Sequence, residues 1–201
     1  MDKGEKWLAL KEECTNFFEK NFQDTRKDIV FGAGDLDAAI MLIGEAPGRQ
    51  EIEQRKPFVG AAGKNLDEFI EILQIDRRDI YIGNVVKFRP FKINPKTNRQ
   101  VNRPPTQEEI SLCKPYLEKE IEIIEPKIIV TLGNTPLKAI SEDQEIKIGD
   151  VHGSPMTIHL PQYQKPLNIY PLYHPASIIY RRQLKEIYIE DVKKLKRIIH
   201  S

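Results

Sequence analysis

Three polar side chains of different chemistry stand at the ends of short apolar runs in this 201-residue sequence. Glu45 offers a carboxylate, Asn84 an amide and His174 an imidazole. Together, such groups can hold a water molecule, read a hydrogen-bonding edge and stabilise negative charge. Taken singly, each also has a structural explanation: a helix cap, a bond to a buried backbone group, or a turn before a proline. They become a candidate pocket only if the fold brings them together.

The apolar runs before these residues predict a parallel sheet. Four runs are rich in β-branched side chains and nearly continuous, as expected for strands buried on both faces: residues 38–44, 80–86, 127–133 and 167–174. Helical patterns separate the runs, so we predict an α/β fold with helices on both faces of the sheet. Ligands bind at the carboxyl ends of such strands, which places all three polar residues at one edge.

Apolar periodicity and capping signals locate the helices. Leu66, Phe69, Ile70 and Leu73 share one helical face, and Thr106 with Glu109 forms a capping box. The predicted helices cover residues 1–14, 63–74, 106–124, 134–140 and 183–199, and a small hairpin is predicted within residues 145–166. The length favours a single domain spanning residues 1–201.

Composition is that of a globular protein, with 40% hydrophobic and 30% charged residues. No apolar run approaches the ~18–20 residues that a membrane span needs, so we expect no membrane partner. The amino-terminal residues read as an amphipathic helix and not as a signal peptide. Cys14 and Cys113 suggest no disulfide framework, and we expect a cytoplasmic protein.

The net charge of +1 does not by itself indicate a nucleic-acid partner, but one segment does. Residues 85–105 contain six cations and no acid: Lys87, Arg89, Lys92, Lys96, Arg99 and Arg103. Prolines and asparagines in the segment predict a loop, and unpaired basic charge on a loop predicts phosphate contacts. A merely flexible loop is the alternative. The GEAPG turn at residues 44–48 lacks the features of a P-loop or a dinucleotide fingerprint.

Five segments in order carry a family resemblance: VFGAGDLDAAIMLIGEAPG, PFVGAAGKNLD, IYIGNVVKFRP, IIVTLGN and YHPASII. In this combination, the chain from about residue 30 onward resembles the family 4 uracil-DNA glycosylases of the uracil-DNA glycosylase superfamily. The resemblance implies a three-layer α/β/α fold around a four-stranded parallel sheet. It also implies an enzyme that flips uracil out of DNA and hydrolyses its N-glycosidic bond in base excision repair. The expected partner is uracil-containing DNA, and we expect a monomer.

The resemblance assigns roles within the pocket. Glu45 is the nearest candidate to position the attacking water, because Ala46 stands where better-known superfamily members carry an aspartate. His174 would donate to uracil O2 as the base leaves, Phe58 would stack on the ring, and Asn84 would read its O4–N3 edge. The other implied substrate-binding residues are Gly44, Gly48 and Glu51, with Glu51 as a gate near the C5 edge of the base.

A DNA-binding loop is implied after His174. Ile178 and Ile179 would form an apolar wedge that fills the gap left by the flipped nucleotide, flanked by Arg181 and Arg182. Ser177, Lys87 and Arg89 complete the predicted DNA-binding residues.

The chain departs from the family at its metal site. Family 4 members typically hold a [4Fe–4S] cluster with four cysteines, of which Cys113 matches one. Phe88 replaces the cysteine of the K-C-R-P motif, and Phe17 stands at the partner spacing of Cys14. Two thiols cannot supply the four ligands, so we expect no metal cofactor, with Phe88 filling the space.

Two other functions stay open from the sequence. One is a glycosylase for another deaminated base such as hypoxanthine, against which the pyrimidine-reading role of Asn84 argues. The other is a catalytically silent nucleic-acid-binding module of the same fold, which has no use for a uracil pocket. A nucleotide-phosphate enzyme lacks its phosphate-loop motif.

Overall fold

The computed structural model describes residues 1–22, 27–178 and 182–200, apart from the side chains of residues 61, 62 and 182. The elements, in chain order, are α1 (Lys3–Asn21), β1 (Ala33–Gly34), β2 (Ile40–Gly44), α2 (Arg49–Gln54), α3 (Ala61–Leu73), η2 (Arg77–Asp79), β3 (Ile80–Asn84), β4 (Phe91–Ile93), β5 (Gln100–Asn102), α4 (Gln107–Ile124), β6 (Ile128–Leu132), α5 (Asn134–Ser141), α6 (Ile148–Val151), β7 (Met156–Ile158), β8 (Leu167–Leu172), α7 (Pro175–Ile178) and α8 (Arg182–Ile199). Among these described helices, none is both long and apolar enough to cross a lipid bilayer.

The predicted parallel sheet forms the centre of the fold. Its strands are ordered β1-β3-β2-β6-β8-β7, and the four central strands β3, β2, β6 and β8 run parallel to one another. Both edge strands, β1 and β7, pair antiparallel. The α/β prediction is confirmed, but the sheet has six strands where four were predicted. The missed strands are only two and three residues long and are not fully buried, so they give no apolar run to detect.

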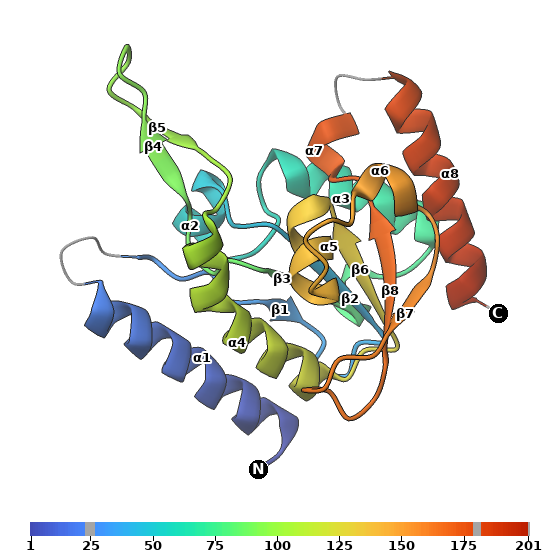
Figure 1. Cartoon of the computed structure of the whole chain (residues 1–201), viewed down its shortest axis with the longest axis horizontal. Helices are drawn as coiled ribbons and strands as arrows, with labels where there is room; N and C mark the ends of the chain where they lie inside the picture. The colour runs from blue at the N-terminus through green and yellow to red at the C-terminus, as the bar shows by residue number, and fades with distance from the viewer. Residues whose placement is uncertain (23–26, 179–181, 201) are drawn as a thin grey trace.

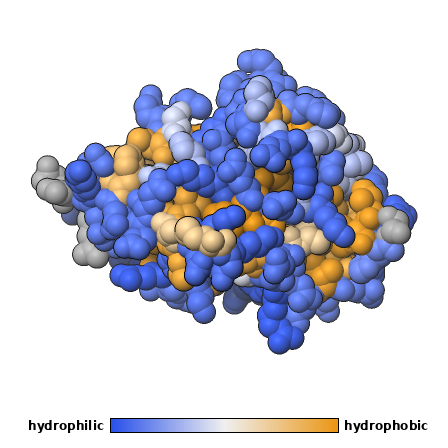
Figure 2. All heavy atoms as spheres, turned by 90° about the horizontal axis from the view of Figure 1, so that it is seen from below, coloured by the Kyte–Doolittle hydropathy of each residue, from blue (hydrophilic) through white to orange (hydrophobic). Residues whose placement is uncertain are grey.

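Helices cover both faces of this sheet (Figure 1). On one face, apolar side chains of α1, α4 and α5 pack against the sheet in one buried cluster. On the other, α3 and α8 pack against alternate residues of the same strands in a second cluster. The three-layer α/β/α arrangement follows because each central strand is buried on both faces. Seen from below, on the side where the parallel strands begin, the surface is mostly hydrophilic with apolar patches between the polar side chains (Figure 2).

The basic segment after β3 is a two-stranded hairpin and not the loop that its composition predicted. β4 and β5 pair antiparallel from Phe91 opposite Asn102 to Ile93 opposite Gln100. At the tip, the Asn94 side chain accepts the backbone N–H groups of Lys96 and Thr97, and its carbonyl accepts that of Asn98. This turn chemistry is why an asparagine-rich segment forms an ordered hairpin. The hairpin projects from the sheet edge on the side opposite α7 (Figure 1).

The capping box of α4 is confirmed, and it also anchors the hairpin. Thr106 accepts the Glu109 backbone N–H, and Glu109 accepts the Thr106 backbone N–H. The Arg103 guanidinium donates both Nη atoms to the same Glu109 carboxylate, at 2.7 and 2.8 Å. Bidentate geometry is the strong form of this pair, so the base of the hairpin is fixed to the start of a long helix.

The Lys87 side chain lies inside the protein, so its predicted contact with DNA phosphates is wrong. Its ammonium is 0% exposed, pairs with the equally buried Glu120 of α4, and donates to the Asn84 carbonyl at 2.8 Å. Glu120 also accepts the Tyr81 hydroxyl at 2.7 Å and the Gly32 backbone N–H at 3.2 Å. The sequence alone does not predict that Lys87 is buried, because only the fold reveals its buried partner.

Removal of the Glu120 carboxylate should strongly destabilise the folded protein, because Lys87 is then buried without a counter-charge. We expect Glu120→Ala to lower the free energy of unfolding by about 3–5 kcal/mol in urea titrations. The control is Glu122→Ala on the same helix, where an exposed side chain should change stability by less than about 0.5 kcal/mol. The apolar pair Lys87→Met with Glu120→Leu should recover only part of the loss, because it removes the unpaired charge but leaves the Tyr81 hydroxyl and the Gly32 N–H without their acceptor. Equal losses for Glu120→Ala and Glu122→Ala would contradict the role of the pair.

Candidate active site

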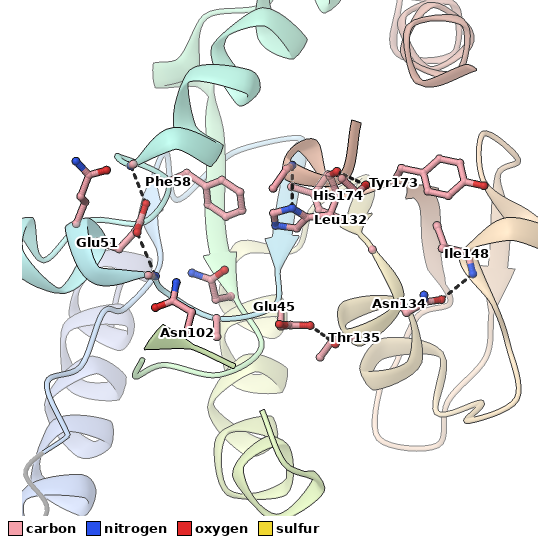
Figure 3. A pocket seen from close by; sticks show the side chains of 18 of the residues that line it. Glu45, Glu51, Phe58, Asn102, Leu132, Asn134, Thr135, Ile148, Tyr173 and His174 are labelled. Atoms are coloured by element: carbon pink, nitrogen blue, oxygen red, sulfur yellow. Dashed lines mark hydrogen bonds between the residues drawn. The ribbon is translucent and has the colours of Figure 1, made fainter. Parts of the chain in front are cut away.

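A cleft of about 780 Å³ opens at the carboxyl ends of the parallel strands (Figure 3). Its lining brings together the three polar residues that the sequence predicted, Glu45, Asn84 and His174. It also contains five more of the predicted site residues: Ala46, Gly48, Glu51, Phe58 and Ser177. Residues that are far apart in the sequence meet here because β2, β3 and β8 end at one edge of the sheet.

Gly44 lies beneath the cleft and explains why β2 ends in glycine. A Cβ atom at this position would lie 2.5 Å from both Asn84 Oδ1 and Phe58 Cζ. Its carbonyl accepts the Val85 backbone N–H at 2.9 Å, and the Glu45 carbonyl accepts that of Val86 at 3.0 Å. The absent side chain therefore allows the amide and the aromatic ring to close over the strand end.

Phe58 turns its ring into the cleft from a left-handed backbone conformation, with φ of +53°. Such a conformation costs an aromatic residue free energy, so other contacts must hold it. Arg77 Nη2 donates to the Phe58 carbonyl at 2.8 Å. A Cβ on Gly63 would lie 2.1 Å from that carbonyl oxygen, so the start of α3 can approach it only as glycine. The ring faces His174 across the cleft, with centroids 6.4 Å apart (Figure 3).

Glu51 is the second group that fixes this region. One carboxylate oxygen accepts the backbone N–H groups of Val59 at 3.1 Å and Gly60 at 2.7 Å. The other accepts the Gly48 N–H at 3.1 Å, so the carboxylate ties the GEAPG turn to the Phe58 segment. The side chain is only 8% exposed. These bonds give Glu51 a positioning role, while the predicted gate at the C5 edge of a base stays a prediction.

Asn84 presents a nearly buried amide to the cleft, since the residue is only 3% exposed. Within the described part of the chain, its side-chain amide has no hydrogen-bond partner. The amide atoms are not among the buried polar atoms without a partner in the described residues, so they face the cleft, where a ligand with a matching donor and acceptor can bond them. The Lys87 ammonium holds the backbone carbonyl of Asn84, so the amide is presented from a fixed position.

His174 is held as a neutral donor. The backbone N–H of Ala176 donates to Nδ1 at 3.1 Å, so the ring proton is on Nε2. Burial lowers the pKa of the imidazole below its ordinary value, which favours the uncharged ring at neutral pH. Nε2–H is therefore available to a ligand atom in the cleft.

Glu45 has a hydrogen-bond partner, Thr135, that the sequence did not predict. The hydroxyl of Thr135 donates to Glu45 Oε2, which orients the carboxylate from the start of α5 (Figure 3). Asn134 beside it accepts the Ile148 backbone N–H at 2.8 Å and so joins α5 to α6. Thr135 gives no motif signal of its own, but its place two residues after the apolar run at 127–133 could have identified it.

The structure contradicts one of the remaining DNA-binding predictions, leaves others untested, and does not describe the rest. Ile178 is only 5% exposed and packs in the cluster with α3 and α8, so its predicted role as a wedge is wrong for this conformation. The Ser177 hydroxyl is exposed and donates to the His174 carbonyl at 2.7 Å. The Arg89 guanidinium donates to Asn102 and Gln100 of β5, which leaves its phosphate contact a prediction. Ile179 and Arg181 lie outside the described residues, as does the side chain of Arg182.

The residues at the family's cluster position do not fit four-cysteine iron–sulfur ligation. Cys14 and Cys113 are free and buried, and burial raises the thiol pKa to about 12 and about 11, respectively. Phe88 is 1% exposed and packs on Phe18, with ring centroids 5.4 Å apart. No group of three or more histidine, cysteine or acidic side chains within the described residues could hold a metal. Two protonated thiols beside aromatic rings lack the thiolate set that a cluster requires.

Comparison with known proteins agrees with this site and fold. The family model described as the uracil DNA glycosylase superfamily matches residues 31–196. The chain therefore belongs to the uracil-DNA glycosylase superfamily.

Individual relatives carry a more specific name. A type-4 uracil-DNA glycosylase of Sulfurisphaera tokodaii is 40% identical over 98% of this chain and 86% of its own. One of Saccharolobus solfataricus is 41% identical over 88% of this chain and 78% of its own. One of Thermotoga maritima is 38% identical, covering 87% and 84% of the two chains.

Replacement of the Glu51 carboxylate should loosen the Phe58 segment. Glu51→Gln keeps one acceptor oxygen but turns an amide N–H towards the Gly48 N–H, so we expect a loss of about 1–3 kcal/mol in the free energy of unfolding. Glu53→Gln on the same helix, at an exposed ion pair with Arg49, should cost at most about 0.5 kcal/mol. Equal unfolding midpoints for the two variants would show that the three backbone bonds do not matter.

The lowered pKa of His174 should make stability depend on pH. The folded state binds this proton less readily than the unfolded state, so stability falls as the pH drops from above the ordinary histidine value towards the lowered one. We expect thermal melts at pH 7.5 and pH 5 to show a larger loss for the wild type than for His174→Gln. Other titrating groups are shared, so the difference isolates His174. An identical pH response of the two proteins would contradict this.

Proposed function

We propose that this protein is a uracil-DNA glycosylase, which flips uracil out of DNA and hydrolyses its N-glycosidic bond in base excision repair. The observation that carries the proposal is the Asn84 amide, nearly buried and unpartnered among described residues, in a cleft flanked by Phe58 and His174. Membership of the superfamily and the names of the relatives support it.

The cleft suits a flipped pyrimidine. Stacking on the Phe58 ring would replace part of the base stacking lost from the duplex. The Asn84 amide would donate to uracil O4 and accept from N3–H. Cytosine presents a donor at position 4 and an acceptor at N3, which would leave two mismatched pairs at an amide that is only 3% exposed.

Bond cleavage would leave the electron pair of the C1′–N1 bond on the departing base, with negative charge shared by O2. The neutral His174 Nε2–H would donate to O2 as this charge develops, which stabilises the transition state. Glu45, with Oε2 occupied by Thr135, would use Oε1 to orient the water that attacks C1′. The proton lost from that water would pass to Glu45 or to solvent.

Affinity for DNA would come from separate residues. Lys92, Lys96 and Arg99 are exposed on the β4–β5 hairpin, whereas Arg103 is engaged with Glu109. These three exposed cations would contact phosphates and so set the salt dependence of binding, not the choice of base. We further propose that the protein works as a single-domain cytoplasmic monomer without an iron–sulfur cluster.

The test is excision of uracil from a DNA oligonucleotide under single-turnover conditions, followed by alkaline cleavage. We expect the wild type to excise uracil in a sample that contains no stoichiometric iron or sulfide after anaerobic purification. Asn84→Ala should lower the rate by about 10²-fold or more, since it leaves O4 and N3–H unpaired. Asn84→Asp should lower the preference for uracil over cytosine, because a carboxylate accepts from the exocyclic amine.

The matched control is Asn16→Asp, which makes the same change at an exposed position of α1. It should excise uracil at the wild-type rate. Wild-type protein that does not cleave uracil but releases hypoxanthine, or that binds DNA without any excision, would refute the proposed function. Excision by Asn84→Ala at the wild-type rate would refute the assigned pocket.

A further inference from the structure

The β4–β5 hairpin has two different faces. Side chains of directly paired residues lie on the same side of a ribbon, so Phe91 shares one face with Asn102, and Ile93 shares it with Gln100. Lys92, paired with Val101, lies on the other face. Asn102 also lines the active-site cleft. The face with Phe91 and Ile93 therefore continues outward from the wall of the cleft.

Phe91 and Ile93 belong to neither hydrophobic cluster of the described core. Phe91 is 39% exposed and Ile93 is 50% exposed, side by side at alternate positions of one strand. The Arg89 guanidinium lies over the Phe91 ring, 5.9 Å from its centroid. A basic arm with an apolar stripe aimed along a binding cleft matches the surface of a nucleic acid, which offers phosphates and apolar base and sugar faces.

The hairpin holds these side chains in place. Arg103 is bonded bidentately to Glu109 at its base, Arg89 Nε donates to Asn102 Oδ1 at 2.7 Å, and the Asn94 turn closes its tip. An arm fixed at base and tip loses little conformational entropy when it meets a ligand.

Position and charge identify that ligand. The hairpin and α7 lie on opposite sides of the carboxyl ends of the parallel strands (Figure 1), and both contribute residues to the cleft, Asn102 from the hairpin and Ser177 from α7. On the α7 side, Ile178 is buried and Ile179 lies outside the described residues, so among the described residues the exposed apolar pair beside the cleft is on the hairpin. The hairpin strands and turn carry Lys92, Lys96 and Arg99 and no acid, which favours a polyanion over an apolar protein partner.

We propose that Phe91 and Ile93 pack against the bases and sugars of the DNA strand beside the flipped nucleotide. This rests on the proposed function and adds to it a second, apolar arm that contacts DNA from the hairpin side. The basic residues of the same arm supply phosphate contacts, so apolar and electrostatic contributions should separate experimentally.

The test is binding to duplex DNA that contains a non-hydrolysable 2′-fluorinated deoxyuridine, at several salt concentrations. We expect Phe91→Ser with Ile93→Ser to weaken binding about tenfold or more, in line with the loss of one or two stacking contacts. The slope of log K against log salt should not change, because no charge is removed. A 2-aminopurine placed beside the uracil analogue should fluoresce less with the Phe91→Ser, Ile93→Ser variant than with the wild type, because the variant unstacks the neighbouring base less.

Two further variants make the result specific. Leu8→Ser with Ile198→Ser removes comparable exposed apolar surface from α1 and α8 and should leave affinity unchanged. Phe91→Trp keeps an aromatic face and should bind like the wild type. Melting temperatures within a few degrees of each other establish that all variants are folded.

Affinity of the Phe91→Ser, Ile93→Ser protein equal to that of the control would overturn the proposal, as would a changed salt slope. These results are distinct from failure of the proposed function, which would appear as a wild type that does not excise uracil from the hydrolysable duplex.

Discussion

The buried ion pair between Lys87 and Glu120 connects most of what the active site depends on. Lys87 fixes the Asn84 carbonyl, and Glu120 belongs to α4, whose first turn anchors the hairpin through Arg103. Tyr81 joins Glu120 to Trp7 of α1, which donates to the Tyr81 hydroxyl at 2.7 Å. Two charges taken out of water are stable only when their remaining hydrogen-bonding groups are also satisfied. The pair therefore requires β3, α1 and α4 to be positioned together.

Close approach is the second constraint, and it explains the glycines and the carboxylate of the opening motifs. Gly44 leaves room for Asn84 and Phe58, while Glu51 supplies an acceptor to three backbone N–H groups. Those N–H groups belong to two turns that no regular element satisfies. A carboxylate shared between them ties the two turns together, so the Phe58 segment and the GEAPG backbone are held at a fixed separation.

The sequence could predict the parallel strands and their common edge because fully buried strands give continuous apolar runs. The cleft residues Glu45, Asn84 and His174 followed from that edge, and the resemblance supplied their chemical roles. Burial of particular side chains could not be predicted in the same way. Lys87 and Ile178 were assigned to DNA by residue type, but each has partners that are far away in the sequence. The hairpin was missed because its strands are three residues long and exposed, so only the turn chemistry of Asn94 marks it.

The turn from Asn84 to Phe88 shows how one short segment meets three demands. Asn84 faces the cleft, Lys87 enters the polar network, and Phe88 packs among aromatic rings where the family places a cluster cysteine. The Lys87 backbone N–H donates to the Cys113 sulfur at 3.4 Å, which ties the same turn to α4. A metal cluster would hold this turn by covalent ligation, whereas here apolar packing and a buried charge pair do so. This packing and the charge pair restrain the segment that continues directly into the hairpin, and so help to fix the position of the arm relative to the cleft.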